Sequence, residues 1–315
     1  GTVYKSLGLY DAAVPLVSKS VERRRSLFGD DHLSVAESLT NLGEVQALKA
    51  EFDAAEQNLR DALGVRRELL GNEAPDVADT LTQLAYVLTE KGEYADAEPL
   101  IRESLEIRRA VHGESHPDVA DSLEDLALNL FDQGDFEQSV PLLREAVAMR
   151  RDTQGELHPD LAEAINNLAF VLGQSGNLEE AGTLFLQALD MKRQVFEDAH
   201  PEVAMGLSNV AYIDHVQGNS AAAEPMYEEL ITVQKWLLGD QHPDVASSMH
   251  NLAFLYYEMG DSDKARALEG EVLEMQRTTL GNEHPDVAQS LNTIAMWSMD
   301  CLLYTSDAAD DFAVV

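Results

Sequence analysis

A 42-residue period runs through almost the whole chain and restricts its fold more than any other feature. Proline recurs with every step equal to 42 residues, at Pro75, Pro117, Pro159, Pro201, Pro243 and Pro285. Glycine keeps the same interval, at Gly92, Gly134, Gly176, Gly218 and Gly260. A fixed period in this range is typical of a solenoid, in which each unit buries its apolar face only against its neighbours.

One period, residues 75–116, contains two stretches whose apolar residues recur at helical spacing. The first, "PDVADTLTQLAYVLTEKG", places Val77 and Leu81 on one face, and the second, "EYADAEPLIRESLEIRRAVHG", does the same around Ile101. Gly92 lies between them and suits the left-handed turn that ends a helix. Each unit is therefore predicted to be a helix A, a tight turn and a helix B, and the fold class is all-α.

The string "HPDVA" occurs at 116–120, 242–246 and 284–288, and close variants occupy the same place in the other units. Proline is tolerated best at the first helical position, and the residue before it is extended, as an N-cap residue must be. The motif therefore predicts the start of helix A. A zinc site needs several converging ligands, whereas these histidines belong to successive units, and "HGESH" at 112–116 offers no third ligand. We expect no metal and no cofactor.

Composition excludes several classes of function. The 57 acidic and 22 basic residues leave a net charge of −35, which would repel nucleic acid and anionic membranes. No long uncharged run indicates a membrane span, and the N-terminus does not resemble a signal peptide, so a cytoplasmic location is expected. The single cysteine, Cys301, rules out an internal disulfide framework. No nucleotide-binding, nucleophile-elbow or zinc-protease string occurs, so we do not expect an enzyme.

The strings "NLAFVLGQSGNLEEAGTLFLQALDMKR" (167–193) and "LGNEHPDVAQSLNTIA" (280–295) resemble a tetratricopeptide array of the kinesin-light-chain type, which uses a 42-residue unit. The resemblance extends from residue 1 to about 296 and suggests a fragment of a bacterial or metagenomic protein. It implies a right-handed superhelical solenoid of antiparallel helix pairs, with helix A lining the concave wall. The family's small residue in helix A falls on Gly43, Ala85, Ala127, Ala169, Ala211, Ala253 and Ala295.

The repeat register predicts four segments. They are a partial repeat at 1–32 (the end of a helix A plus a helix B), six full repeats at 33–284, helix A of a truncated repeat at 285–299, and a non-repeat tail at 300–315. In the tail, Leu302 replaces the expected glycine, and "CLLYTSDAADD" resembles translated sequencing-adapter read-through. The alternative is a genuine acidic tail.

The resemblance also implies which side chains line the groove, at positions i, i+3, i+7 and i+10 of each helix A. The third position is apolar in five successive helices and aromatic in four, which favours a surface for a partner, unless neighbouring helices cover the rings. Asparagines beside this stripe match family positions that contact a peptide backbone, although packing alone would also explain them. The candidate groove residues are Thr82, Tyr86, Asn166, Asn167, Phe170, Ser208, Asn209, Tyr212, His215, His250, Asn251, Phe254 and Tyr257.

Charged residues also follow the period. Asp79, Asp121, Glu124 and Glu163 begin the groove stripe, so the N-terminal half should favour a basic or neutral partner. Two ladders of basic residues lie near the end of helix B, at positions that include Arg66, Arg108, Arg150 and Lys192 and, one residue later, Arg67, Arg109, Arg151 and Arg193. They suit the helix dipole and nearby carboxylates, with an anionic partner as the alternative.

These patterns predict a protein–protein interaction scaffold that binds an extended or helical peptide segment of a protein partner in the concave groove. Two alternatives stay open. One is that the array is the sensor or scaffold portion of a larger signalling enzyme or ATPase, and the other is that it is a passive spacer. The sequence fixes neither the partner's identity nor the oligomeric state.

Overall fold

The computed structural model describes residues 9–311, and every secondary-structure element in this range is an α-helix. The chain divides into two compact units, Gly1–Glu156 and Leu157–Val315. The helices of the first unit are α2 (Tyr10–Phe28), α3 (Leu33–Leu48), α4 (Phe52–Leu70), α5 (Pro75–Glu90), α6 (Tyr94–His112), α7 (Pro117–Asp132) and α8 (Phe136–Gln154). Those of the second are α9 (Pro159–Gln174), α10 (Leu178–Val195), α11 (Pro201–Val216), α12 (Ser220–Leu238), α13 (Pro243–Glu258), α14 (Ser262–Leu280) and α15 (Pro285–Asp311).

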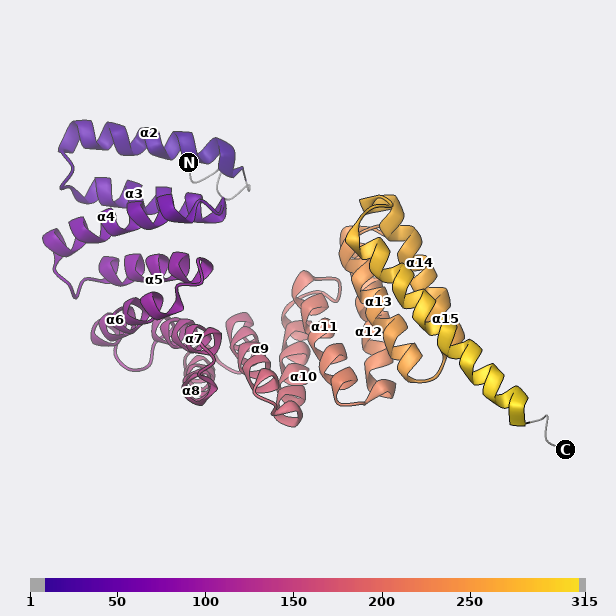
Figure 1. The fold of residues 1–315 in the computed structure, drawn as a ribbon. Helices are drawn as coiled ribbons and strands as arrows, with labels where there is room; N and C mark the ends of the chain where they lie inside the picture. Colours follow the sequence, from indigo (N-terminus) through magenta and orange to yellow (C-terminus); the bar gives the residue numbers. More distant parts are fainter. Residues whose placement is uncertain (1–8, 312–315) are drawn as a thin grey trace. The chain divides into compact units, whose positions relative to one another are not determined.

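Within each unit, every helix packs against the next one along the chain, which confirms the predicted stack of helix pairs (Figure 1). Odd-numbered helices are the predicted helices A, and even-numbered helices are the predicted helices B. The turn between them uses a glycine in the left-handed region, such as Gly92 at φ 77° and Gly134 at φ 83°. Ala50 occupies this slot in one repeat at φ 59°, a conformation that costs a side chain with a Cβ more than it costs glycine.

The histidine of "HPDVA" caps helix A with its side chain. In α9, for example, His158 Nδ1 accepts the backbone N–H of Asp160 at 3.2 Å, and Pro159 follows as the first helical residue. The same bond forms in the other units that have the histidine, at His32, His116, His200, His242 and His284. In each of these contacts Nδ1 is the acceptor, so the ring takes the place of the serine or aspartate side chain that often caps a helix. The sequence pattern predicted the start of helix A, but it did not predict that the histidine side chain caps this helix.

The predicted small column of helix A lies in the core. Ala85, Ala127, Ala169, Ala211 and Ala253 are all at most 2% exposed. Gly43 shows why the slot must stay small, because a Cβ there would lie 2.7 Å from Leu59 Cγ of the following helix. Ala295, on α15, is exposed.

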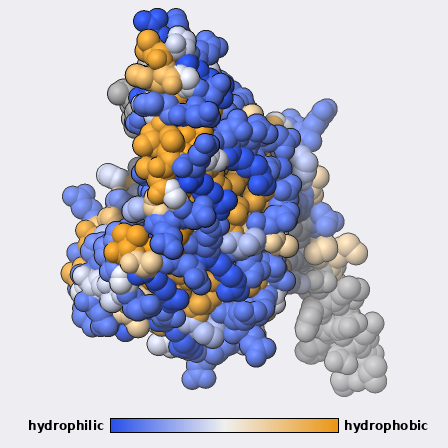
Figure 2. Space-filling view, turned by 90° about the vertical axis from the view of Figure 1, so that its left-hand side faces the viewer, coloured by the Kyte–Doolittle hydropathy of each residue, from blue (hydrophilic) through white to orange (hydrophobic). Residues whose placement is uncertain are grey.

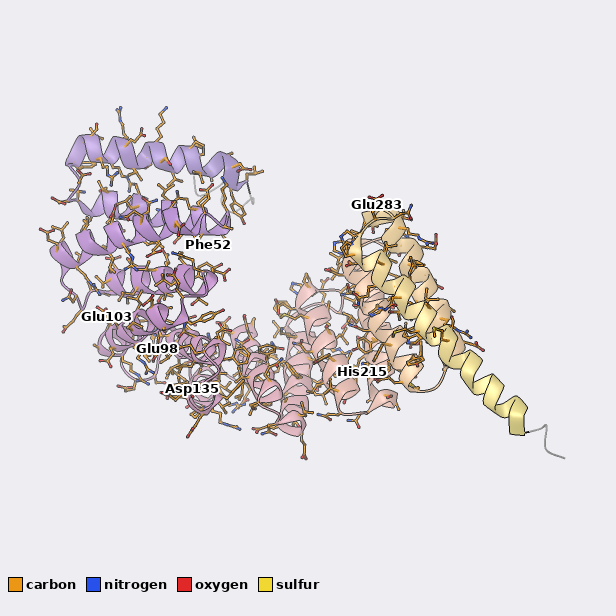
Figure 3. The ribbon with its side chains drawn as sticks, in the orientation of Figure 1. Phe52, Glu98, Glu103, Asp135, His215 and Glu283 are labelled. Carbon is orange, nitrogen blue, oxygen red and sulfur yellow. The ribbon has the colours of Figure 1, made fainter. Side chains whose placement is uncertain are left out.

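The basic ladders connect successive helices. Arg108, near the end of α6, donates to the carbonyl of Asp118 at 3.2 Å and to the hydroxyl of Ser122 at 2.8 Å, both in α7. The second ladder joins one helix B to the next, and Arg67 of α4 pairs with Glu103 of α6 at 2.6 Å (Glu103 is labelled in Figure 3). Equivalent pairs are Arg109–Glu145 at 2.7 Å and Arg193–Glu229 at 2.6 Å. These contacts favour the structural interpretation of the ladders.

The ends of the chain add two observations. Helix α15 continues to Asp311, beyond residue 299, where the expected helix A ends, and no turn forms at Leu302, the slot that holds glycine in other repeats. The predicted end of a helix A within residues 1–8 and the last part of the tail, 312–315, lie outside the described residues. Among the described helices, none is both long and apolar enough to cross a membrane.

Candidate functional site

The four aromatic rings of the predicted stripe are open to solvent. Tyr86, Phe170, Tyr212 and Phe254 keep 49%, 43%, 58% and 41% of their surface exposed. Figure 2 shows one face of the molecule, on which apolar residues gather in patches among a mostly hydrophilic surface. Neighbouring helices therefore leave these rings open, although each helix A buries its other apolar face in the core.

In the second unit, the stripe borders a cavity of about 270 Å³, which we call the second-unit cavity. Helices α9 and α11 supply most of its wall, and Phe185 of α10 and Tyr227 of α12 form part of its lining. Gly173 lies in the wall, where the lack of a side chain leaves room. The predicted groove residues that line this cavity are Phe170, Ser208, Asn209, Tyr212 and Asn251.

The predicted amides differ in their surroundings. Asn209 Nδ2 donates to Asn166 Oδ1 at 2.7 Å, so this pair joins α11 to α9 across the groove face. Both side chains are partly buried, as is Asn167. Asn251 is exposed beside the second-unit cavity. The 166–209 pair thus forms a hydrogen bond within the protein, whereas Asn251 is accessible.

A row of aromatic rings continues from α11 to α15. The His215 ring, whose residue is labelled in Figure 3, lies 6.1 Å from that of Phe254, and Phe254 lies 6.4 Å from Trp297. Tyr257 stacks on Trp297 at 4.9 Å, and Trp297 is 1% exposed. His215 also meets Glu258, with Nε2 and Oε2 2.8 Å apart. His215 and Tyr257 are therefore partly buried and support the neighbouring exposed ring of Phe254.

His250 lies in a separate hollow of about 290 Å³, with Ser247 and Asn251 from its own helix and residues of α14 and α15. Its Nδ1 lies 2.8 Å from Oε2 of Glu269, a carboxylate that is completely buried. This hydrogen bond raises the pKa of His250, against the effect of burial. The imidazole therefore carries its proton more readily than a solvent-exposed histidine does.

The first unit contains a cavity of about 420 Å³ between α5, α6 and α7, which we call the first-unit cavity. Thr82 and Tyr86, both predicted groove residues, line it. Two carboxylates that the groove pattern did not include, Asp125 and Asp132, also line it. Both belong to α7, and each lies one residue after a position of the predicted groove pattern.

The acidic residues that the sequence pattern placed in this half of the groove are mostly paired. Arg150 meets Asp121 at 2.6 Å and Glu124 at 2.5 Å, and Glu124 is only 7% exposed. Asp79 lies 3.4 Å from Arg108. The ladder therefore offsets these charges, and the acidity that faces the first-unit cavity comes from Asp125 and Asp132. Glu163, the fourth of the predicted acids, is exposed at the start of α9.

The structure corrects one detail about metal binding. Asp118 brings a third potential ligand to His112 and His116, with the three ligand atoms within 4.8 Å of one another. The two rings are stacked with centroids 4.2 Å apart, and Nδ1 of His116 already accepts the N–H of Asp118. Nδ1 of His116 therefore serves the capping of α7, and an ion bound through this nitrogen would have to displace that hydrogen bond.

Comparisons with known proteins agree with the fold. A family model described as tetratricopeptide repeat matches residues 1–68, 76–152, 160–235 and 202–278. No curated protein matches the chain. A crystal structure of a Podosopora anserina putative kinesin light chain with nearly identical TPR-like repeats has a TM-score of 0.61 and 24% identity, covering 66% of this chain and 98% of its own.

Two further solved structures resemble the chain. The structure of BtubC (BKLC) from P. vanneervenii has a TM-score of 0.60 and 20% identity, over 88% of this chain and 94% of its own. The apo form of RapI has a TM-score of 0.59 and 13% identity, over 84% and 96%. The expected likeness to kinesin-light-chain-like repeat proteins is confirmed. With helix pairs repeated every 42 residues and a repeat model that matches most of the sequence, the chain belongs to the tetratricopeptide-repeat family.

Proposed function

We propose that this scaffold holds an extended or helical peptide segment of a protein partner along the exposed faces of its helices A. The observation that supports this function is the exposure of one aromatic ring at the same slot of α5, α9, α11 and α13. Exposed aromatic rings at regular spacing beside cavities are typical of interfaces, because such rings bury a large area at small entropic cost.

The second-unit cavity suits an apolar side chain of the peptide, since Phe170, Tyr212 and Tyr227 form much of its wall. Asn251, exposed at its edge, offers an amide donor and acceptor to the peptide main chain. The charge of −35 supports a basic or neutral partner over nucleic acid or an anionic membrane.

A random peptide library displayed on phage tests the proposal. The full chain should enrich a set of related sequences, and the double variant Tyr212→Ala, Phe254→Ala should lose them while keeping its helical circular dichroism. Trp236→Ala is the matched control, because Trp236 is 71% exposed on α12 and lies outside this face. Enrichment that survives the double variant, or that fails with Trp236→Ala instead, would contradict the proposed location. Loss of helicity in the double variant would show that the two rings belong to the core.

A further inference from the structure

The first-unit cavity combines apolar walls with hydrogen-bond acceptors. Tyr86, Leu128 and Ile101 provide apolar surface, and the carboxylates of Asp125 and Asp132 belong to the same lining. Asp125 is partly buried, whereas Asp132 is exposed. A long side chain that entered this space would meet hydrocarbon along its length and negative charge beside it.

The repeat itself singles out Asp125. The residues at the same position in the helix A of the other five full repeats, 42 residues apart, are neutral amides, namely Asn41, Gln83, Asn167, Asn209 and Asn251, and α15 has Thr293 there. Packing at this slot is thus satisfied by an amide, and the carboxylate is a departure specific to α7. Because an ionised carboxylate costs more to bury than an amide does, the charge needs another explanation than packing.

Two cations, Arg108 and Arg150, attract Asp125 electrostatically but form their hydrogen bonds with other groups. Arg108 donates to Asp118 and Ser122, and Arg150 pairs with Asp121 and Glu124. Among the described residues, Asp125 itself forms no hydrogen bond or ion pair, and burial raises its pKa to about 6. A carboxylate in this state gains more from a new cation than one already paired on the surface.

A second acceptor lies in the same cavity without a donor. Gln83 Oε1 is buried and has no hydrogen-bond partner, while Gln83 Nε2 donates to Glu44. The bond to Glu44 orients this amide and leaves its oxygen without a partner. Buried acceptors without a donor are rare in folded proteins, because each costs free energy. Neither Asp125 nor Gln83 Oε1 has a donor among the described residues, and a cationic side chain would supply several.

We propose that the first-unit cavity binds a lysine or arginine side chain of the partner peptide, with its methylene groups against Tyr86 and Leu128 and its charged end at Asp125 and Gln83. This inference rests on the proposed function and adds the chemical class of one peptide residue. Asp132, at the exposed side of the lining, strengthens the attraction of the cation towards the cavity.

The test uses the full chain and the same random peptide library. Peptides selected by the wild-type chain should share a lysine or arginine, and Asp125→Asn should abolish that preference. Asparagine occupies this slot in other repeats, so the variant is expected to fold. Asp152→Asn, on an exposed site of α8, removes the same charge outside the cavity and should keep the preference.

Affinities of one selected, fluorescein-labelled peptide make the test quantitative. Asp125→Asn should weaken its binding by about tenfold or more, the usual effect of losing a charge-assisted hydrogen bond. Replacing its basic residue by norleucine should do the same, and the two changes together should cost little more than either one. The norleucine substitution leaves the protein unchanged, so it tests whether the peptide's charge contributes to binding even where Asp125→Asn alters folding.

The outcomes separate the two proposals. Peptides that depend on Tyr212 and Phe254, yet show no basic preference or bind Asp125→Asn equally well, would overturn the lysine or arginine site and leave the proposed function intact. A library that yields no enriched sequence with the wild-type chain would overturn the proposed function, and this inference with it.

Discussion

At the scale of single residues, the histidine before each helix-A proline acts through a hydrogen bond that a sequence pattern does not show. Its extended backbone brings Nδ1 within 3.1–3.3 Å of the N–H two residues later, in each repeat where the histidine is present. One repeat lacks this bond, because Ala74 caps α5 without a side-chain acceptor. The chain thus provides its own comparison between capped and uncapped helices.

We expect Ala74→His to stabilise the protein by about 1 kcal/mol, and His158→Ala to destabilise it by about the same amount, because each change adds or removes one N-cap bond. Urea unfolding followed by circular dichroism measures both. Ala74→Leu is the control, since it adds volume without an acceptor and should not stabilise. A stabilisation by leucine equal to that by histidine would show that the ring acts by packing.

The pair of His250 and Glu269 predicts a pH dependence. The hydrogen bond raises the pKa of His250 above the ordinary value of about 6.5. A group whose pKa is higher in the folded state stabilises fully below its unfolded pKa and loses that effect as the pH rises through the folded one. The unfolding free energy should therefore fall as the pH rises above about 6.5, and His250→Gln should remove this part of the fall. Identical pH dependence in the variant and the wild type would contradict this account.

Single residues also explain why part of the candidate site could be predicted from the sequence and part could not. Tyr86, Phe170, Tyr212 and Phe254 stand out in the sequence because they break the polar side of an otherwise amphipathic helix. Asp125 lies in an amide column and does not stand out until the cavity and the engaged arginines around it are known. The repeat supplies the one signal that was available, a carboxylate where the other full repeats have an amide.

At the scale of helices, neighbouring repeats are joined by packed small residues and by the arginine ladder. Arg150 of α8 is the most buried arginine of the ladder that includes Arg66 and Arg108, with 7% of its side chain exposed, and it faces two carboxylates of α7, the helix A of its own repeat. Removing one member of a buried ion pair leaves the other charge without compensation. We therefore expect the buried arginines of the ladder to contribute most to the stability of the protein.

Arg150→Met should destabilise the protein by about 3–5 kcal/mol, because the buried Glu124 would lose the guanidinium that it pairs with. Arg109→Met is the control, since Arg109 is partly exposed and pairs with exposed Glu145, and it should cost about 1 kcal/mol or less. Chemical unfolding of both variants gives the comparison. Equal effects of the two substitutions would mean that the burial of Arg150 is unimportant.

Ala169→Leu should destabilise the protein by about 1–3 kcal/mol, because Ala169 is completely buried between packed helices and has no room for a larger side chain. Ala222→Leu, at an exposed position of α12, is the matched control and should change stability little. Thermal unfolding distinguishes them. Unchanged melting of Ala169→Leu would contradict the assignment of helix A to this register.

At the scale of the whole chain, the repeated pattern was enough to predict helix pairs and their order, because every unit packs only against its neighbours. The bounds of α15 were not predictable in the same way. The register ends near residue 296, and beyond it no glycine breaks the helix, which continues to Asp311. The sequence pattern did not predict the cavities either, since each depends on which side chains of several neighbouring helices leave space.

Hydrogen exchange of the full chain, with and without a peptide selected from the library, tests the central claim most directly. Binding on the helix-A faces predicts slower exchange in α9, α11 and α13, with α5 and α7 included when the peptide carries a basic residue, and little change in α10, α12 and α14. Protection confined to the helices B, or no protection at a saturating peptide concentration, would contradict the account.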